Sequence, residues 1–451
     1  MASAVETLVQ TEAQAPQSDL KTAAAPKPGL SAAAPQLLKA WIGTQSINTA
    51  RHAAALRPFR TGEFGGGAAA PTDGHLEAVN KLITELRRGL FRFSKDVTAA
   101  AKTAARDLQP ASLGEMVNRK EKAHHWVQGI EKIWDFYFEL FGQRQSRYAN
   151  WLLSCDRIAL DCYRAAYLNL GVARSIPAPP PFAYMRTGFS PATFRRGIPL
   201  KRLGKQLNPF PLVELPYHRL VNPWTLGAVL HEISHNLQTD LGLSKSIPRR
   251  IALRLLRAGF PKSVAMTWTR WNREMFADMS ALLLGGPEVA GSLMDVIGRG
   301  TETTVSFNPR GVHPTPYLRM LNTVELLRRM GFVKEADQYR WSWKRIYGNG
   351  AHGTIPQQMM RTFPRACALA VDTMCYQPYP SLGNKSLAQV IVFGRKEQQM
   401  IEEAARRLAS GTDPGIIPER FVIGAARHAM EHRMARPGTI AKNFYKALAS
   451  G

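Results

Sequence analysis

Apolar residues recur at helical spacing along most of the chain and change to other patterns at only a few points. Three stretches, 76–90, 126–140 and 151–170, place aliphatic or aromatic residues three and four positions apart, which predicts amphipathic helices with buried aromatic side chains. Two short runs, 182–186 and 210–217, are typical of strands, and a proline-rich break at 175–181 precedes the first. The pattern predicts an α+β protein that is predominantly helical, with a small mixed sheet.

The stretch 222–242 is predicted to contain a buried helix. Asn222 is a candidate N-cap, Pro223 suits the first helical position, and Gly242 suits the end. The apolar positions between them follow one helical face: Leu226, Val229, Leu230, Ile233 and Leu237.

This helix carries the motif H-E-x-x-H at 231–235. His231 and His235 are four residues apart, so both imidazoles leave one helix face and can reach one metal ion. Glu232 lies beside them, where a carboxylate can accept a proton from a water that the metal activates. The motif therefore predicts a metal site with a general base.

A third ligand has to come from elsewhere in the chain. The metzincin continuation of the motif is excluded, because Gln238 and Leu241 stand where glycine and histidine are required. Asp240 is poorly aimed at a metal on the histidine face. Glu274 opens a second helical pattern that stops at 285–287, and Asp278 follows one turn later, where it can accept the free N–H of a ligating imidazole.

Together these five residues resemble the gluzincins, the thermolysin-like zinc peptidases with HExxH followed by ExxxD on a later helix. The resemblance covers about residues 210–290. It implies one Zn²⁺ held by His231, His235 and Glu274, with Glu232 as general base and Asp278 orienting a ligand histidine. It also implies a zincin-like catalytic core around the HExxH helix, flanked by helical N- and C-terminal regions. The activity implied is that of a zinc metalloendopeptidase acting on a protein or peptide substrate.

Further site residues are predicted on both sides of this motif. A zinc peptidase needs a donor for the oxyanion of its tetrahedral intermediate, and His313 or Tyr317 could supply it, while Arg319 could brace the site. Each could equally be a loop, core or surface residue. In the family, a strand before the HExxH helix is the sheet edge that binds extended substrate. The flanking prolines at 211 and 216 predict this edge here, with substrate contacts at Leu212, Val213, Glu214 and Leu215.

Composition sets the wider bounds. With 451 residues, 45% of them hydrophobic, the chain suits two or three domains. We expect an Ala/Pro/Gly-rich disordered tail at 1–72 with a short helix near 35–55, a helical region at 73–175, the catalytic core at 176–312 and a helical region at 313–451. No signal peptide or membrane span is evident, which predicts a cytoplasmic protein with non-classical export as the alternative. The four cysteines are expected to be free and mostly buried.

The net charge of +25 is concentrated in two segments without acidic residues. One contains Arg164, Arg174, Arg186, Arg195, Arg196, Lys201, Arg202 and Lys205, and the other contains Lys245, Arg249, Arg250, Arg254, Arg257, Lys262, Arg270 and Arg273. Both segments flank the metal motif, which suggests an acidic substrate, nucleic acid or an anionic membrane surface as a partner; the alternative is a solvated basic surface that reflects arginine usage alone. Segment 247–260 is a basic amphipathic helix that could lie on a membrane or pack on the catalytic core, and packing is the simpler account.

Two other functions stay open. The chain could be an inactive zincin-like scaffold, although an intact Glu232 argues against this. It could also be a basic nucleic-acid-binding protein with a structural zinc, although no nucleic-acid-binding motif is present. A second motif, H-x-x-E-H at 428–432, is excluded as the site because no acidic residue follows Glu431 to complete the ligand set.

Overall fold

A computed structural model describes residues 33–171, 175–199, 206–348 and 353–450. The chain divides into two compact units, one formed by residues up to 51 and 93–123, the other by 52–92 and 124–451. The predicted regions 73–175, 176–312 and 313–451 do not coincide with these bounds. The first part of the predicted tail, residues 1–32, lies outside the described residues.

Three long helices contribute to both units: α1 (Ala33–Ala55), α2 (Asp73–Asp107) and α3 (Pro110–Gly142). Helix α1 confirms the helix expected near 35–55. In the first unit, the three helices bury a small core of Ile42, Ala101, Ala104 and Met116. The Lys120 ammonium also lies 5.4 Å from the ring centre of Trp41.

The segment after α1 corrects the prediction of a disordered tail as far as residue 72. Phe59 and Phe64 are buried and pack with Phe141 in an aromatic cluster of the second unit. Arg57 and Glu63 form an ion pair of 2.7 Å across this turn. A composition rich in glycine and alanine therefore does not prevent order here, because two phenylalanines supply enough buried apolar surface.

The sheet has three strands, β1 (Phe182–Met185), β2 (Ala192–Phe194) and β3 (Leu212–Leu215), in the order β1-β3-β2. Strands β1 and β3 are parallel, and β2 is antiparallel to β3. The prediction that 210–216 forms a sheet edge is therefore wrong: β3 is the central strand. Pro211 and Pro216 flank β3, and the Pro211 carbonyl still accepts from the Phe182 N–H at 2.9 Å, so the missing proline N–H groups do not interrupt the strand.

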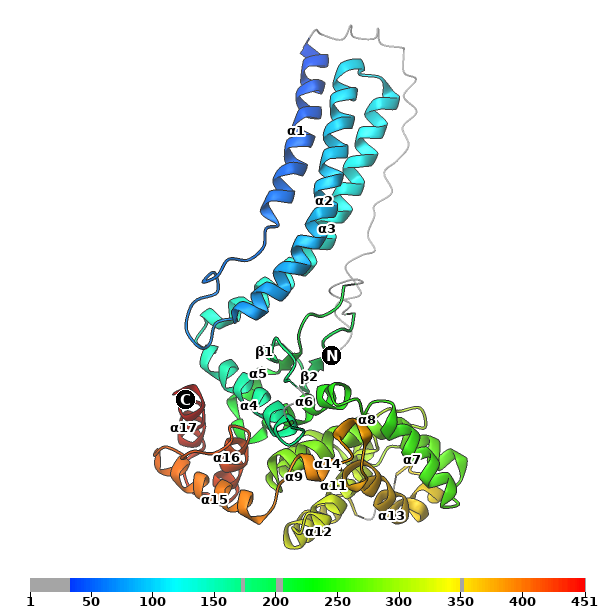
Figure 1. Ribbon diagram of the computed structural model, residues 1–451, viewed down its shortest axis with the longest axis vertical. Coiled ribbons are helices and arrows are strands. Elements are labelled where there is room, and N and C mark those ends of the chain that lie inside the picture. Colours follow the sequence, from blue (N-terminus) through cyan, green and yellow to red (C-terminus); the bar gives the residue numbers. More distant parts are fainter. Residues whose placement is uncertain (1–32, 172–174, 200–205, 349–352, 451) are drawn as a thin grey trace, which may run out of the picture. The chain divides into compact units, whose positions relative to one another are not determined.

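Helix α6 (Gly227–Asp240) lies beside this sheet and at the centre of the second unit (Figure 1). The Asn236 amide donates to the Thr193 hydroxyl at 2.8 Å, which ties α6 to β2. On another side, α6 packs along α8 (Lys262–Gly285), where Gln238 donates to Asn272 at 3.1 Å. A third neighbour is α4 (Ala149–Leu168), one of the predicted helices.

The glycines that end α6 and α8 were predicted correctly from the sequence, whereas the start of α6 was not. Gly242 has φ of +72° directly after α6, as its predicted role as the stop requires. The predicted start is wrong: Pro223 opens a short 3₁₀ turn (Pro223–Thr225), and α6 begins only at Gly227. Gly286 has φ of +74° after α8, which confirms the predicted stop near 285–287.

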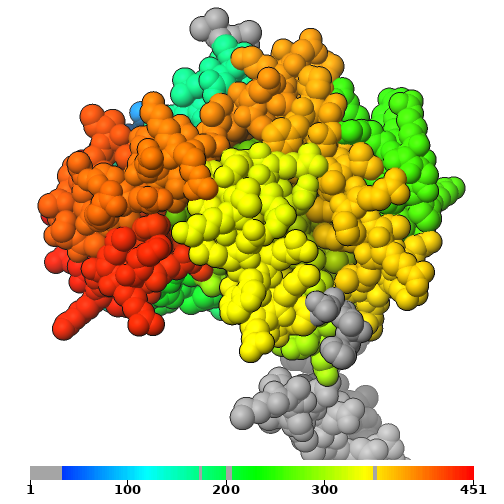
Figure 2. Space-filling model, turned by 90° about the horizontal axis from the view of Figure 1, so that it is seen from below, coloured from blue at the N-terminus to red at the C-terminus, as the bar shows by residue number. Residues whose placement is uncertain are grey.

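The rest of the second unit is helical and encloses one large core with α4, α6 and α8. Its elements are α5 (Tyr217–Val221), α7 (Ser246–Arg257), α9 (Glu288–Ile297), α10 (Thr301–Thr304), α11 (Pro316–Arg329), α12 (Val333–Tyr347), α13 (Gln357–Val371), α14 (Leu387–Val390), α15 (Arg395–Ser410), α16 (Phe421–Glu431) and α17 (Pro437–Ser450). Figure 2 shows the face where α12 (yellow) lies beside the C-terminal helices (orange to red). The protein is thus mostly helical with a small mixed sheet, as expected.

Several smaller expectations can be settled. All four cysteines are free and buried. Helix α7 packs on the core through Ile247, Ile251 and Leu255, while Leu256, expected on the same side, is 45% exposed. Within the described ranges, no helix combines the length and the apolar character needed to cross a membrane.

Candidate metal centre

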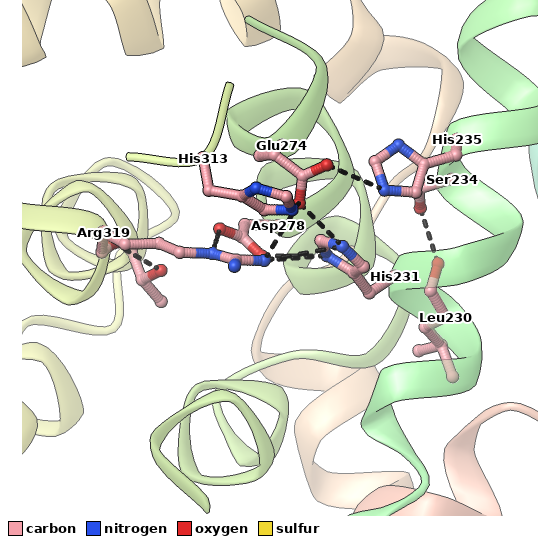
Figure 3. Close-up of polar contacts among 9 residues, drawn as sticks. Leu230, His231, Ser234, His235, Glu274, Asp278, His313 and Arg319 are labelled. Atoms are coloured by element: carbon pink, nitrogen blue, oxygen red, sulfur yellow. Dashed lines mark hydrogen bonds and ion pairs between the residues drawn. The ribbon is translucent and has the colours of Figure 1, made fainter. Parts of the chain in front are cut away.

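The predicted ligand residues come together from two packed helices. His231 and His235 lie one turn apart on α6, and Glu274 faces them from α8 (Figure 3). The two carboxylate oxygens of Glu274 divide between the histidines, with Oε2 at 3.5 Å from His231 Nε2 and Oε1 at 3.4 Å from His235 Nε2. One ligand atom from each residue lies within 4.8 Å of the other two. These three residues could therefore hold a metal ion.

A buried ion pair lies behind His231. Asp278 Oδ1 is 2.9 Å from His231 Nδ1, the ring nitrogen that does not face Glu274. Arg319 on α11 makes two contacts with the same carboxylate, Nε to Oδ2 at 2.5 Å and Nη2 to Oδ1 at 2.7 Å. The predicted positions of Asp278 as the orienting group and Arg319 as the brace agree with this geometry. The Asp278 contact distinguishes the two nitrogens of His231 and leaves Nε2 facing Glu274, whereas Arg319 Nη2 lies 3.4 Å from both nitrogens.

His235 has no such support. Its Nδ1 is buried without a hydrogen-bond partner among the described residues. Its position is set by the helix backbone, which is reinforced by Ser234 Oγ donating to the Leu230 carbonyl at 2.7 Å. The two histidines are thus held in different ways.

Burial and neighbouring charges shift the pKa values of the histidines and carboxylates of the site in different directions. Burial lowers the pKa of His235 to about 3, so this imidazole is neutral. Burial also opposes charge on His231, but hydrogen bonds to Asp278 and Glu274 outweigh it and raise the pKa of His231 to about 10. For Glu274, burial is likewise outweighed by the hydrogen bond and charge of His231, which hold its pKa below the usual range. Both carboxylates therefore remain ionised, since the pKa of Asp278 is also lowered by Arg319 and His231 against the effect of burial.

Glu232 differs from the other two carboxylates. It is only 8% exposed and lines the cavity in front of the histidines. Burial raises the pKa of Glu232 to about 7, which suits a group that must both accept and release a proton near neutral pH.

His313 reaches the site from the loop before α11. Its Nε2 lies 3.4 Å from Glu274 Oε2, its side chain is 65% exposed, and it lines the same cavity. It is not part of the compact ligand group. This position fits contact with a substrate better than a place among the metal ligands.

Tyr317 does not belong to the site, which corrects its predicted catalytic role. It is 1% exposed within the core, and its hydroxyl donates to the Gly348 carbonyl at 3.3 Å. Residues two apart on a helix face different sides, so Arg319 points into the site while Tyr317 points away. The alternative interpretation of Tyr317 as a core residue is confirmed.

The predicted substrate-binding strand is also misplaced. Leu212, Val213 and Leu215 are fully buried in the central strand, and Glu214 accepts a hydrogen bond from the Tyr184 hydroxyl at 2.6 Å. None of the four lines the cavity at the site. The loop before β2 does line it, through Ser190 and Pro191, which the sequence did not single out because β2 is only three residues long.

A cavity of about 460 Å³ opens beside the metal ligands. Helices α6, α8, α9 and α11 and the loop after α10 contribute to its walls. Gly227 is needed there, because a Cβ at this position would lie 2.7 Å from Ser292 Cβ and push α6 away from α9. Ligand residues and cavity are therefore built by one set of helix contacts.

The two basic segments are partly neutralised in the fold. Arg164, Arg186 and Arg254 pair with Glu419, Glu214 and Asp372, acids that come from other parts of the chain. Four exposed cations on and next to α7 have no ion-pair partner among the described residues: Lys245, Arg249, Arg257 and Lys262. Arg174, Lys201, Arg202 and Lys205 lie outside the described residues.

The excluded motif at 428–432 is engaged in other contacts. Glu431 pairs with Arg427 at 2.7 Å, and His428 faces the buried Glu288 at 3.3 Å. In comparisons with known proteins, no family model, no curated protein and no solved structure matches this chain.

Proposed function

We propose that this protein is a zinc-dependent metallopeptidase with a zincin-like catalytic core. The observation that carries the proposal is the convergence of His231, His235 and Glu274 beside a cavity that His231, Glu274 and Glu232 line. The HExxH helix beside a small sheet with an antiparallel edge strand supports the same proposal.

The donor set fits zinc by its chemistry. Two imidazole nitrogens and one carboxylate oxygen form a catalytic zinc set, which leaves one coordination position for water or substrate. In a tetrahedral site with ligands at about 2.0–2.1 Å, neighbouring ligand atoms lie about 3.4 Å apart. Glu274 approaches the two histidines with different oxygens, Oε2 at 3.5 Å from His231 Nε2 and Oε1 at 3.4 Å from His235 Nε2. Since one ligand atom from each residue lies within 4.8 Å of the other two, side-chain rotations would have to bring them to the tetrahedral spacing.

Bound zinc would supply Lewis acidity, which polarises a scissile carbonyl and makes a water acidic enough to lose a proton near pH 7. Glu232 would accept that proton and later deliver it to the leaving amine, a double role that its raised pKa allows. His313, exposed at the cavity, would donate a hydrogen bond to the oxyanion. Asp278 and Arg319 would hold His231 in the tautomer that presents Nε2.

An extended substrate would bind to strand β2 rather than to β3. Strand β2 is at an edge of the sheet, it is tied to α6 directly after His235, and its preceding loop lines the cavity. Adding a peptide as a further strand would satisfy unpaired backbone groups of this edge.

Metal content and peptide hydrolysis, measured on the same preparations, test the proposal. Wild-type protein should contain about one zinc per chain and cleave a mixture of unstructured peptides. His235→Ala and Glu274→Ala should lose zinc, whereas Glu232→Gln should keep zinc and lose activity by about 10²–10⁴-fold. Zinc with no cleavage by wild type would favour the inactive-scaffold alternative. Zinc that is retained after Glu274→Ala would contradict the ligand set.

A further inference from the structure

The cavity beside the metal ligands changes character along its length. Its inner wall is apolar and comes from the end of α8 and one face of α9: Ala281, Leu282, Val289, Leu293, Val296 and Ile297. Such a wall favours an apolar side chain, which loses its hydration on entry. The wall ends where α9 ends, at Ile297, and Arg299 follows two residues later.

Arg299 is unusual among the residues that line this cavity. The other charged or titratable ones, His231, Glu232, Glu274, Asp278, His313 and Arg319, all belong to the candidate metal centre. The Arg299 side chain is exposed, and no carboxylate of the described chain lies within ion-pair distance of it. The nearby acid Asp295, one turn earlier on α9, is already paired with Arg427. Arg299 therefore presents an uncompensated positive charge at the cavity.

The position of this charge is well defined. The Arg299 guanidinium lies 4.5 Å from the ring centre of Phe189, on the loop whose next residues, Ser190 and Pro191, line the same cavity. A cation over an aromatic face is stabilised there and keeps its N–H groups available at its edges. The backbone is also anchored, since the Tyr347 hydroxyl donates to the Arg299 carbonyl at 2.9 Å. The guanidinium thus lies between the loop of Phe189 and the apolar wall.

We propose that Arg299 binds a carboxylate of the peptide substrate, adjacent to an apolar residue that occupies the cavity. This inference rests on the proposed function, because it takes the ligand to be a peptide at the metal centre. The net charge of the chain suggested only that the substrate is acidic. The inference assigns recognition of the acidic group to one residue, Arg299, at the cavity. A guanidinium suits a carboxylate because two parallel N–H groups match its two oxygens. The carboxylate can belong to an Asp or Glu side chain or to the C-terminus of a short peptide.

Binding to a catalytically silent protein tests the inference without depending on cleavage. The protein is the zinc-loaded full chain with Glu232→Gln. The probes are fluorescein-labelled peptides with one Leu in an Ala background, flanked on both sides by Glu or by Gln. A second pair ends one residue after the Leu, as a free carboxylate or as a carboxamide. We expect the carboxylate member of one pair or of both to bind about tenfold more tightly in fluorescence anisotropy, a typical gain for a charge-assisted pair. The pair that discriminates identifies the source of the carboxylate.

Variants at Arg299 show whether this residue is responsible. Adding Arg299→Gln should bring the affinity ratio to about one, because the carboxylate peptides lose their partner. Arg299→Lys should keep part of the ratio, because it keeps the charge but not the paired N–H groups. Arg345→Gln, an exposed arginine on α12 that does not line the cavity, should keep all of it. Thermal unfolding of each variant checks that the fold is intact.

The possible failures are distinct. The inference would be overturned if the two members of each pair bind equally, or if no peptide binds. It would also be overturned if the affinity ratio between carboxylate and neutral peptides is unchanged in Arg299→Gln. Cleavage by the chain with Glu232 but without discrimination would overturn it too, and would leave the peptidase proposal standing. Discrimination without any cleavage would support the carboxylate site and contradict the proposed function.

Discussion

Asp278 Oδ1 lies 2.9 Å from His231 Nδ1, on the side of the imidazole away from Glu274. This contact should raise metal affinity, because a carboxylate behind a ligand histidine fixes its orientation and increases its basicity. We expect Asp278→Asn to weaken zinc binding by about 10–100-fold, measured by competition with a chromophoric chelator. The control is Asp337→Asn, which removes an exposed carboxylate paired with Arg328. An unchanged affinity in Asp278→Asn would show that the contact is irrelevant to the metal.

Arg319 should contribute more to stability than any exposed arginine pair. Its guanidinium and the Asp278 carboxylate are 10% and 5% exposed, so Arg319→Ala removes the two-point partner of a buried anion and leaves it only the contact with His231. We expect a loss of about 3–5 kcal/mol in the free energy of unfolding of the zinc-free protein, measured by urea denaturation. Arg395→Ala breaks an exposed pair with Glu335 of similar length, 2.6 Å, and should cost no more than about 1 kcal/mol. Comparable losses in the two variants would argue against a buried charge network.

Zinc binding should depend on pH through one proton. In the metal-free protein, the raised pKa of His231, about 10, keeps this ring protonated at neutral pH, whereas the lowered pKa of His235, about 3, keeps that ring neutral. A metal at Nε2 of His231 must displace the proton, so affinity should rise about tenfold per pH unit between about pH 7 and 9. Calorimetry in buffers of different ionisation enthalpy should detect release of about one proton per zinc. Release of none would contradict the protonated state.

The same pKa shift predicts how the metal-free protein responds to alkali. A pKa raised from the ordinary 6.5 to about 10 stabilises the fold fully below pH 6.5, and this stabilisation is lost as the pH rises through 10. The zinc-free chain should therefore melt at a lower temperature at pH 10 than at pH 7, and His231→Gln should reduce this difference. Melting curves across this range, recorded with a chelator present, provide the measurement.

Substitutions of His313 and Tyr317 should have different effects on peptide hydrolysis, although the two residues are only four positions apart. His313→Ala should lower kcat/KM for peptide hydrolysis by about 10²–10³-fold if it donates to the oxyanion. Tyr317→Phe removes only a 3.3 Å hydrogen bond to the Gly348 carbonyl, so kcat/KM should stay within about twofold and stability should fall by about 1 kcal/mol. A large kinetic effect of Tyr317→Phe would contradict its placement in the core.

Local signals predicted the helices well because the chemistry of helix ends is local. Glycines at 242 and 286 take up positive φ, which few other residues do at low cost, and they end α6 and α8 as expected. The place of a strand within the sheet was not predictable in this way. Prolines 211 and 216 are compatible with an edge strand, and also with a central strand that is confined to the residues between them. The strand is central because β2 pairs with its second edge. Strand β2 has three half-buried residues and no clear alternation.

The cluster of His231, His235 and Glu274 was partly predictable, because the pairs His231–His235 and Glu274–Asp278 each lie on one helix at a spacing of four. Spacing along the sequence does not say how close α6 and α8 lie, so only the structure shows that Glu274 approaches the two histidines. The cavity and Arg299 were not predicted, because they depend on where the end of α9 meets the loop before β2, more than a hundred residues earlier. For residues 56–72 the sequence prediction was wrong in the other direction, because it assigned no structure to an ordered segment. Their composition is typical of a disordered tail, but the segment is anchored by two buried phenylalanines, Phe59 and Phe64.

The different support of the two histidines implies an order of events when a metal enters or leaves. His231 is held from behind by Asp278 and Arg319, so its imidazole keeps its orientation with or without an ion. His235 Nδ1 contacts no hydrogen-bonding group of the described chain, so only packing and the 3.4 Å contact of its Nε2 with Glu274 Oε1 oppose rotation of that ring. Of the residues that would hold a metal, His235 is therefore expected to turn away most readily, while His231 keeps its place. Substitutions in the packing around His235 would then change how readily the site gains or loses an ion.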